Sequence, residues 1–301
     1  MSPWTADDVP DCSSETVVVT GANSGLGLEA TRLLAREGAD VVMACRDLER
    51  TEAAREAVRD DDALEVRELD LADLESVRAF ADGLAADRDR VDVLCNNAGV
   101  MALPREETAD GFERQFGVNH LGHFALTGLL FEQLRAAPDP RVVTQSSGLH
   151  ANGEVDFADL HGEECYDPWA AYAQSKLANL LFAYELDRRY GDEVTSVGCH
   201  PGYAATNLQY RAPEKRGSRV RKALMRAANA LFAQSAERGA LPMAYAATAD
   251  DVEGGDYVGP GGLMNVRGSP ETQRSSGRSY DEETARRLWD VSEDLTGVEY
   301  P

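Results

Sequence analysis

The apolar positions near the start of the chain change their spacing at a glycine. Thr16–Thr20 (TVVVT) is a β-branched run that stops at Gly21, as expected for a short buried strand. The next apolar residues recur three and four positions apart, at Leu26, Ala30, Leu33 and Leu34. This spacing predicts a helix over residues 24–37. The segment therefore begins with a strand, a glycine turn and a helix.

The same alternation continues along much of the chain. Apolar and β-branched runs predict strands at residues 41–44, 64–69, 91–95, 141–145 and 194–199. Helical spacing predicts helices over residues 48–58, 74–86, 110–136 and 170–190. Strands that alternate with helices form right-handed crossovers and a parallel sheet covered on both faces. The predicted fold class is α/β, with a doubly wound parallel sheet in a single domain.

Acidic residues outnumber basic residues in this chain. The 301 residues include 53 Asp and Glu against 30 Lys and Arg, for a formal net charge of −23, and only three of the basic residues are lysines. Such a surface makes nucleic acid an unfavourable partner. The composition resembles that of proteins from salt-loving organisms, in which salt screens the self-repulsion. An ordinary acidic protein from a mesophile remains the alternative.

The sequence offers no targeting segment, membrane span or metal-site pattern. No run approaches the ~18 consecutive apolar residues that a membrane helix needs, and the N-terminus lacks a basic flank followed by an apolar stretch. The five cysteines, Cys12, Cys45, Cys95, Cys165 and Cys199, are too scattered for a zinc site or a disulfide framework. Reduced thiols are typical of a cytosolic protein, so we expect a cytoplasmic location.

Two segments differ in charge from the rest. Residues 1–14 are expected to form a mobile acidic tail before a single domain over residues 15–301. Residues 211–226 (RAPEKRGSRVRKALMR) carry seven basic side chains and one acid. They fall in a region, about residues 207–232, that we expect to form a small lid over a site for an anionic ligand. A solvated helix that neutralises nearby acidic surface is the alternative.

The glycine turn after the first strand has the chemistry of a phosphate site. In TGANSGLG, Gly21 can make the tight turn, Gly25 lets the backbone approach a pyrophosphate, and Gly27 permits close packing of helix on strand. The helix N-terminus adds free N–H groups and a positive dipole. A glycine turn with only a structural role is the alternative, but the flanking strand and helix favour dinucleotide binding.

Several motifs together resemble one enzyme family. The Gly-x-x-x-Gly-x-Gly spacing is followed by NNAG at residues 96–99, Asn119, the pair Ser146 and Ser147, and YAQSK at residues 172–176. Over about residues 16–206 this resembles the short-chain dehydrogenase/reductase family. NHLGHF at residues 119–124 and SSGLH at residues 146–150 are most similar to its retinol-dehydrogenase-like branch, which includes the WW-domain oxidoreductase. The resemblance implies a Rossmann fold and no catalytic metal.

The resemblance also implies catalytic roles for four residues. Tyr172 would be the general acid/base, and Lys176, one helical turn away, would lower the Tyr172 pKa and bind the nicotinamide ribose. Ser147, preferred over Ser146 by motif register, would hold the substrate oxygen. Asn119 would position a water that connects Lys176 with solvent. A surface tyrosine that packs on a lysine stem is the alternative for Tyr172 and Lys176 alone.

The cofactor-binding residues follow from the same motifs. Arg46 stands at the end of the second strand, where an acid would bind the ribose of NAD. Its guanidinium can pair with a 2′-phosphate, which favours NADP(H) over NAD(H), although Asp47 follows directly. The other expected contacts are Gly21, Asn23, Ser24, Gly25, Leu26, Gly27, Asp70, Leu71, Asn97, Ala98, Gly99, Tyr172, Lys176, Pro201, Gly202 and Thr206.

The substrate region is less defined by sequence. Residues 148–169, which include His150 and His161, should form a loop beside the substrate. His150 is expected to be a solvated loop histidine, and a contact with the substrate is the alternative. Side chains that could line a lipophilic pocket are Tyr203, Tyr210, Leu224 and Met225. Core packing accounts for these four equally well.

These features predict an NADP(H)-preferring oxidoreductase that moves hydride between nicotinamide and an alcohol or carbonyl carbon. A redox sensor that binds NADP without turnover and a nucleotide-sugar epimerase-like enzyme are the alternatives. The partner is then a small molecule. The resemblance also implies a possible homodimer or homotetramer, through helices over residues 110–136 and 170–190.

Overall fold

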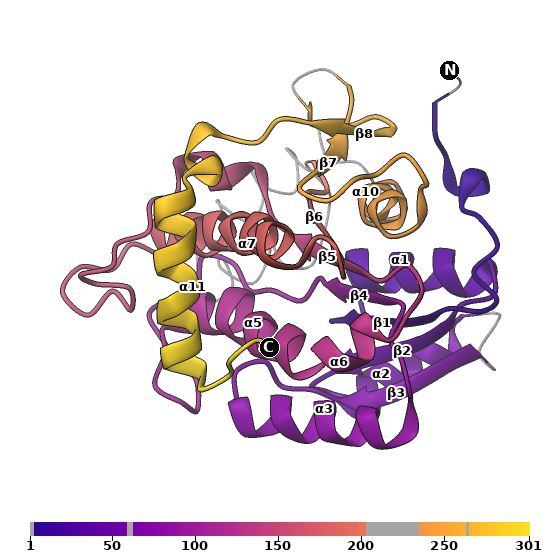
Figure 1. The fold of residues 1–301 in the computed structure, drawn as a ribbon, viewed down its shortest axis with the longest axis horizontal. Helices are drawn as coiled ribbons and strands as arrows, with labels where there is room; N and C mark the ends of the chain where they lie inside the picture. The colour runs from indigo at the N-terminus through magenta and orange to yellow at the C-terminus, as the bar shows by residue number, and fades with distance from the viewer. Residues whose placement is uncertain (1–2, 59–62, 203–234, 263–264) are drawn as a thin grey trace, which may run out of the picture.

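A computed structural model describes residues 3–58, 63–202, 235–262 and 265–301. One eight-stranded sheet runs through it in the order β3-β2-β1-β4-β5-β6-β7-β8 (Figure 1). All neighbouring strands are parallel except β7 and β8, which are antiparallel. The strands are β1 (Thr16–Thr20), β2 (Asp40–Cys45), β3 (Leu64–Glu68), β4 (Val93–Asn96), β5 (Arg141–Gln145), β6 (Thr195–Cys199), β7 (Tyr257–Pro260) and β8 (Pro270–Gln273). The predicted doubly wound parallel sheet in a single domain is confirmed.

Helices cover both faces of this sheet. The helices are α1 (Gly25–Arg36), α2 (Leu48–Glu56), α3 (Leu74–Asp87), α4 (Arg114–Phe116), α5 (Gly122–Leu129), α6 (Phe131–Arg135), α7 (Pro168–Tyr190), α10 (Ala236–Thr248) and α11 (Glu282–Thr296). In Figure 1, α1 and α10 lie on one side of the sheet and α3, α5, α7 and α11 on the other. The order of strands reverses between β1 and β4, which is where doubly wound folds bind ligands.

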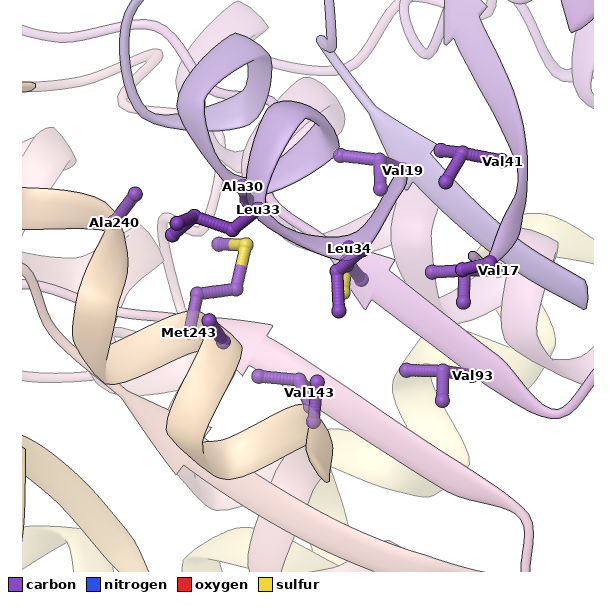
Figure 2. Close-up of a cluster of buried hydrophobic side chains, with 14 of the residues drawn as sticks. Val17, Val19, Ala30, Leu33, Leu34, Val41, Val93, Val143, Ala240 and Met243 are labelled. Atoms are coloured by element: carbon purple, nitrogen blue, oxygen red, sulfur yellow. The ribbon is translucent and has the colours of Figure 1, made fainter. Parts of the chain in front are cut away.

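Burial of the central strands explains their unbroken apolar runs. Val17 and Val19 of β1 lie in the same buried cluster as α1, whose Leu33 lies beside Met243 of α10 (Figure 2). Val18 of the same strand belongs to the cluster on the opposite face. Residues that alternate between two covered faces must all be apolar, so the β-branched run fits a central parallel strand.

The helix predicted over residues 110–136 is interrupted. Gly111 takes φ +85° in a turn beside the bridge between Glu107 and Glu113, so the helical run starts only at Arg114. A π-helical turn over Gly117–Leu121 then separates α4 from α5. Such bulges are frequent at functional sites, and this one contains Asn119.

The expected mobile tail is wrong for residues 3–14. Val9 and Cys12 are buried in the cluster under α1 and α10. The Trp4 ring packs edge-on against Tyr245 of α10, with centroids 5.2 Å apart. Apolar side chains within the acidic stretch therefore dock this segment on the domain.

The surfaces expected to pair between copies are covered within one chain. α11 packs along α7 and α5 (Figure 1). Every residue from Tyr172 to Leu186 is buried, as is every residue from Gln115 to Thr127. These central stretches therefore offer no exposed face for pairing between copies, and a dimer or tetramer through these helices stays a prediction.

No helix among the described residues is both long and apolar enough to cross a bilayer.

Candidate active site

A cavity of about 1260 Å³ opens at the carboxyl ends of β1, β2, β4, β5 and β6. It includes the point where the strand order reverses. Its lining contains nearly all the predicted cofactor residues: Gly21, Asn23, Ser24, Gly25, Leu26, Gly27, Arg46, Asp70, Leu71, Asn97, Ala98, Gly99, Tyr172, Lys176, Pro201 and Gly202. Four further predictions lie outside the described residues. They are Thr206, the lid at residues 207–232, its basic stretch at residues 211–226, and the possible pocket side chains Tyr203, Tyr210, Leu224 and Met225.

The glycine turn has the close packing that a dinucleotide cradle requires. Gly21 and Gly25 take φ +68° and +59°, values that L side chains rarely adopt. A Cβ at Gly27 would lie 2.5 Å from both the Gly21 carbonyl oxygen and Asn97 Nδ2. Ser24 caps α1 without a side-chain hydrogen bond, and the first residues of the helix line the cavity. These residues fit a bound pyrophosphate.

Thr20 fixes the loop after β4 against the glycine turn. Its Oγ1 accepts hydrogen bonds from the amides of Asn97 and Ala98, each at 2.9 Å. Asn97 Nδ2 donates in turn to the Thr20 carbonyl at 2.7 Å. The Asn97 side chain thus ties two strand ends together, a contact that the sequence motif alone does not reveal.

Arg46 and Asp47 take separate roles after β2. The Asp47 carboxylate accepts the Arg50 amide at 3.0 Å and caps α2. Arg46 lines the cavity with an exposed side chain, and its Nη1 lies 3.6 Å from Asp70. Arg50 lines the same part of the cavity, and it was not among the predicted residues.

Tyr172 lies on the cavity wall and is only 5% exposed. Burial raises the pKa of its hydroxyl to about 12, and a hydrogen bond with Ser147 partly offsets that effect. Desolvation disfavours the phenolate. The protein alone therefore holds Tyr172 in its protonated form at neutral pH.

The two adjacent serines differ in what they bind. Ser146 Oγ is buried and donates to the Lys176 carbonyl oxygen at 2.7 Å. Ser147 Oγ accepts the Leu149 amide at 3.3 Å and interacts with Tyr172. Ser146 thus fastens β5 to α7, whereas Ser147 faces the tyrosine.

Lys176 is buried beneath Tyr172. Its Nζ donates to the Gln145 carbonyl oxygen at 2.9 Å. Burial lowers the pKa of the ammonium to about 8. Its charge is therefore less favourable than that of a surface lysine, and any anionic or polar ligand at Nζ would stabilise it.

Asn119 stands behind the cavity wall. Its Nδ2 donates to the Val100 carbonyl and to Ser175 Oγ, each at 2.9 Å, and its Oδ1 accepts the Val100 amide at 2.8 Å. A Cβ at Gly99 would lie 3.1 Å from Asn119 Oδ1 and 3.5 Å from Lys176 Nζ. Gly99 therefore leaves a small space between these two polar groups.

The substrate end of the cavity includes residues that the sequence did not identify. They are Met101, Leu103, Leu149, Trp169, Tyr257, Gln273, Arg274, Ser275 and Ser276. The last five come from β7, the end of β8 and the segment after β8, where no motif signals a function. His150, expected to be solvated, is buried. Among the described residues, no three His, Cys, Asp or Glu side chains are grouped for a metal ion.

Comparison with known sequences identifies the family. The short chain dehydrogenase family model matches residues 15–217. The chain belongs to the short-chain dehydrogenase/reductase family. Members of this family are NAD(P)-dependent oxidoreductases, and this dehydrogenase has the corresponding fold and cavity.

Individual relatives extend the match over nearly the whole dehydrogenase. It is 43% identical to human retinol dehydrogenase 13 over 294 residues, which cover 95% of this chain and 86% of that protein. It is 42% identical to mouse retinol dehydrogenase 12 over 292 residues, covering 95% and 87%. The predicted retinol-dehydrogenase-like relationship is confirmed.

Solved structures agree with the fold of this dehydrogenase. A protein from Mycobacterium paratuberculosis is 44% identical, with a TM-score of 0.83 and full coverage of both chains. An NAD(P)-dependent gluconate 5-dehydrogenase from Beutenbergia cavernae, solved with bound NADP, is 28% identical with a TM-score of 0.62, covering 78% of this chain and 90% of that one.

Proposed function

We propose that this dehydrogenase transfers hydride between NADP(H) and an alcohol or carbonyl carbon, with Tyr172 as the general acid/base. The observation that carries the proposal is that Tyr172, Ser147 and Lys176 line the same cavity at the carboxyl ends of the strands, with the Tyr172 side chain buried. Bound nicotinamide supplies or accepts the hydride. The side chains around the cavity bind and orient the substrate and transfer the proton.

The tyrosine and its neighbours handle the proton. In the reducing direction Ser147 holds the substrate oxygen, and the Tyr172 hydroxyl donates its proton to that oxygen. The positive charge of Lys176 stabilises the phenolate that remains. This offsets the burial that raises the Tyr172 pKa to about 12. In the oxidising direction the Tyr172 phenolate accepts the proton of the substrate alcohol and becomes the hydroxyl again.

Lys176 and Asn119 complete this arrangement. Lys176 Nζ has donors beyond the one given to Gln145, and these would bind the nicotinamide ribose. A water held at Asn119 would connect Lys176 with solvent. The space beside Gly99, between Asn119 Oδ1 and Lys176 Nζ, supports that role.

Preference for NADP(H) rests on the end of β2. Asp47 is committed to the N-cap of α2, so its carboxylate is a poor partner for a ribose hydroxyl. Arg46 and Arg50 both line this part of the cavity. Two guanidinium groups would pair with a 2′-phosphate and gain little from the neutral hydroxyl of NAD.

The substrate is proposed to be an apolar alcohol or carbonyl compound. Met101, Leu149 and Trp169 form apolar walls near Tyr172. The names of the curated relatives denote retinol dehydrogenases. For this chain we propose the wider class of lipophilic substrates.

The described cysteines are all free thiols, which supports a reducing, cytoplasmic setting.

The testing experiment measures oxidation of NADPH and of NADH with a panel of aldehydes and ketones in molar KCl. The Tyr172→Phe variant is assayed alongside, with cofactor affinity measured by fluorescence. We expect faster turnover with NADPH than with NADH, and loss of turnover in Tyr172→Phe at nearly unchanged NADPH affinity. Surviving turnover in that variant would remove Tyr172 from the acid/base role.

A further inference from the structure

His150 connects the turn that carries Ser147 to the C-terminal part of the cavity wall. It lies in the 3-10 turn Gly148–Asn152 and is 4% exposed. The proposed function gives it no role. Both of its ring nitrogens nevertheless have partners, one in Ser147 and the other in Ser276.

The partners determine which ring nitrogen carries the proton. Nε2 lies 3.0 Å from the backbone amide of Ser276, which can only donate. Nδ1 lies 2.7 Å from the carbonyl oxygen of Ser147, which can only accept. His150 is therefore neutral, with its hydrogen on Nδ1. Burial also lowers the pKa of this ring, in agreement with the neutral form.

The Ser147 carbonyl receives two hydrogen bonds from the same residue. The His150 amide donates to it at 2.9 Å, closing the turn, and Nδ1 adds the second bond at 2.7 Å. The oxygen of the Tyr257 hydroxyl lies 3.4 Å from Nδ1, which is long for a hydrogen bond. The ring thus reinforces the turn that orients Ser147.

A second contact ties the same turn to the same C-terminal segment. Arg278 Nη1 donates to the Gly153 carbonyl at 2.8 Å. Gly153 itself packs so closely on α7 that a Cβ there would lie 2.4 Å from the Ala173 carbonyl oxygen. Residues 147–153 are therefore held between α7 and the segment after β8.

We propose that His150 is a positioning residue for Ser147, acting as a neutral link between the Ser147 carbonyl and the Ser276 amide. This inference rests on the proposed role of Ser147 as the group that holds the substrate oxygen. Ser147 Oγ already accepts the Leu149 amide, so its direction follows the conformation of the turn. The segment after β8 then influences catalysis without touching the reacting atoms.

The sharpest test removes one hydrogen bond and leaves His150 in place. Ser276 has φ −69°, which proline adopts readily. Ser276→Pro therefore deletes the amide hydrogen that binds Nε2 with little strain at that residue. Ser276→Ala is the matched control, because it keeps the amide and removes a hydroxyl that has no hydrogen-bond partner among the described residues.

We expect Ser276→Pro to lower kcat by about tenfold, because small displacements of a catalytic group are costly, and to leave NADPH affinity unchanged. Ser276→Ala, which keeps the amide hydrogen, should lower kcat less than Ser276→Pro does, so the difference between the two variants isolates that hydrogen bond. Two His150 variants separate the two ring contacts. His150→Asn can still donate to Ser147 and should retain more activity than His150→Gln, whose amide reaches toward Ser276 instead.

Nitrogen NMR of the histidine rings tests the link independently of turnover. We expect the His150 signals of a protonated Nδ1 and an unprotonated Nε2, with Nε2 shifted in Ser276→Pro. A protonated Nε2 in the wild-type protein would overturn the proposal, as would equal kcat values for Ser276→Pro and Ser276→Ala. Absence of turnover in the wild-type protein would instead overturn the proposed function, while the ring signals would still report on the link.

Discussion

Lys176 and Asn179, less than one turn apart on α7, both donate a hydrogen bond to the carbonyl oxygen of Gln145, each at 2.9 Å. The carbonyl therefore keeps a donor if Lys176 is replaced. The ammonium of Lys176 is buried, and its pKa is lowered from 10.5 to about 8. The folded protein thus carries an unfavourable buried charge at neutral pH.

Lys176→Met should raise stability at pH 7 and abolish turnover. Between pH values of about 8 and 10.5, the unfolded chain binds the Lys176 proton more tightly than the folded protein does. Wild-type stability therefore gains a contribution as pH rises through this window. The advantage of Lys176→Met, roughly 1–3 kcal/mol at pH 7, should shrink across it.

Thermal unfolding at pH 7 and at alkaline pH measures this difference. Asn179→Ala is the control, since it removes the other donor without changing charge. It should destabilise the protein by about 1 kcal/mol at both pH values. A Lys176→Met variant less stable than wild type at pH 7 would contradict the lowered pKa.

Arg46→Asp should shift cofactor preference toward NAD(H). The substitution removes a guanidinium from the cavity and adds a second acid near Asp70, 3.6 Å from the present Arg46 Nη1. A charged hydrogen bond contributes about 1.5–3 kcal/mol, so the ratio of kcat/KM for NADPH over NADH should fall about 10- to 100-fold.

Arg55→Ala is the matched control for this cofactor switch. Arg55 lies on α2, the helix that follows Arg46, and is paired with Glu52 at 2.9 Å. It is not part of the cavity wall. Its loss should leave the cofactor ratio unchanged. An unchanged ratio in Arg46→Asp would remove Arg46 from its proposed role.

Gly27→Ala should weaken cofactor binding by closing the glycine turn. The new methyl group would meet the Gly21 carbonyl oxygen and Asn97 Nδ2 at 2.5 Å, so the backbone at the cavity must move. Gly83→Ala is the control, because it lies within α3 with its nearest neighbour 3.8 Å away. That variant should gain about 0.5–1 kcal/mol of stability and bind NADPH normally, as titration would show.

The covered faces of α7 and α5 predict a monomer. Light scattering should give a mass near 32.7 kDa over a wide range of concentration. α11 would have to leave its site before α7 could pair with a second copy. A stable dimer in which hydrogen exchange of residues 172–186 slows with increasing concentration would contradict this expectation.

Net charge should make stability depend on salt. With a formal charge of −23, the folded chain repels itself, and salt screens exposed charges. The unfolding temperature should rise between about 0.1 M and 2 M KCl, where the Debye length falls from about 10 Å to below 3 Å. A flat dependence would favour an ordinary acidic protein over one adapted to high salt.

The sequence by itself determined the strands, helices and turns that depend on residues close together in the chain. β-branched runs such as Thr16–Thr20 and helical spacing such as that after Gly21 predicted the first six strands and the five helical segments between them, because side-chain periodicity reflects which face is buried. The glycine spacing indicated the candidate nucleotide turn, and the Tyr172–Lys176 spacing indicated the proposed acid/base pair, because both rest on short fixed offsets along the chain.

Only the tertiary structure decided which distant segments of the chain pack against one another. Three such contacts join positions far apart in sequence: residues 3–14 dock on the domain, α11 covers α7, and His150 is buried between Ser147 and Ser276. No periodicity of the sequence encodes these contacts. The same holds for Asp47, whose carboxylate serves as a helix cap, and for Lys176, whose pKa depends on burial. The type of a side chain limits which hydrogen bonds and ion pairs it can form, and the packing around it decides which of them it forms.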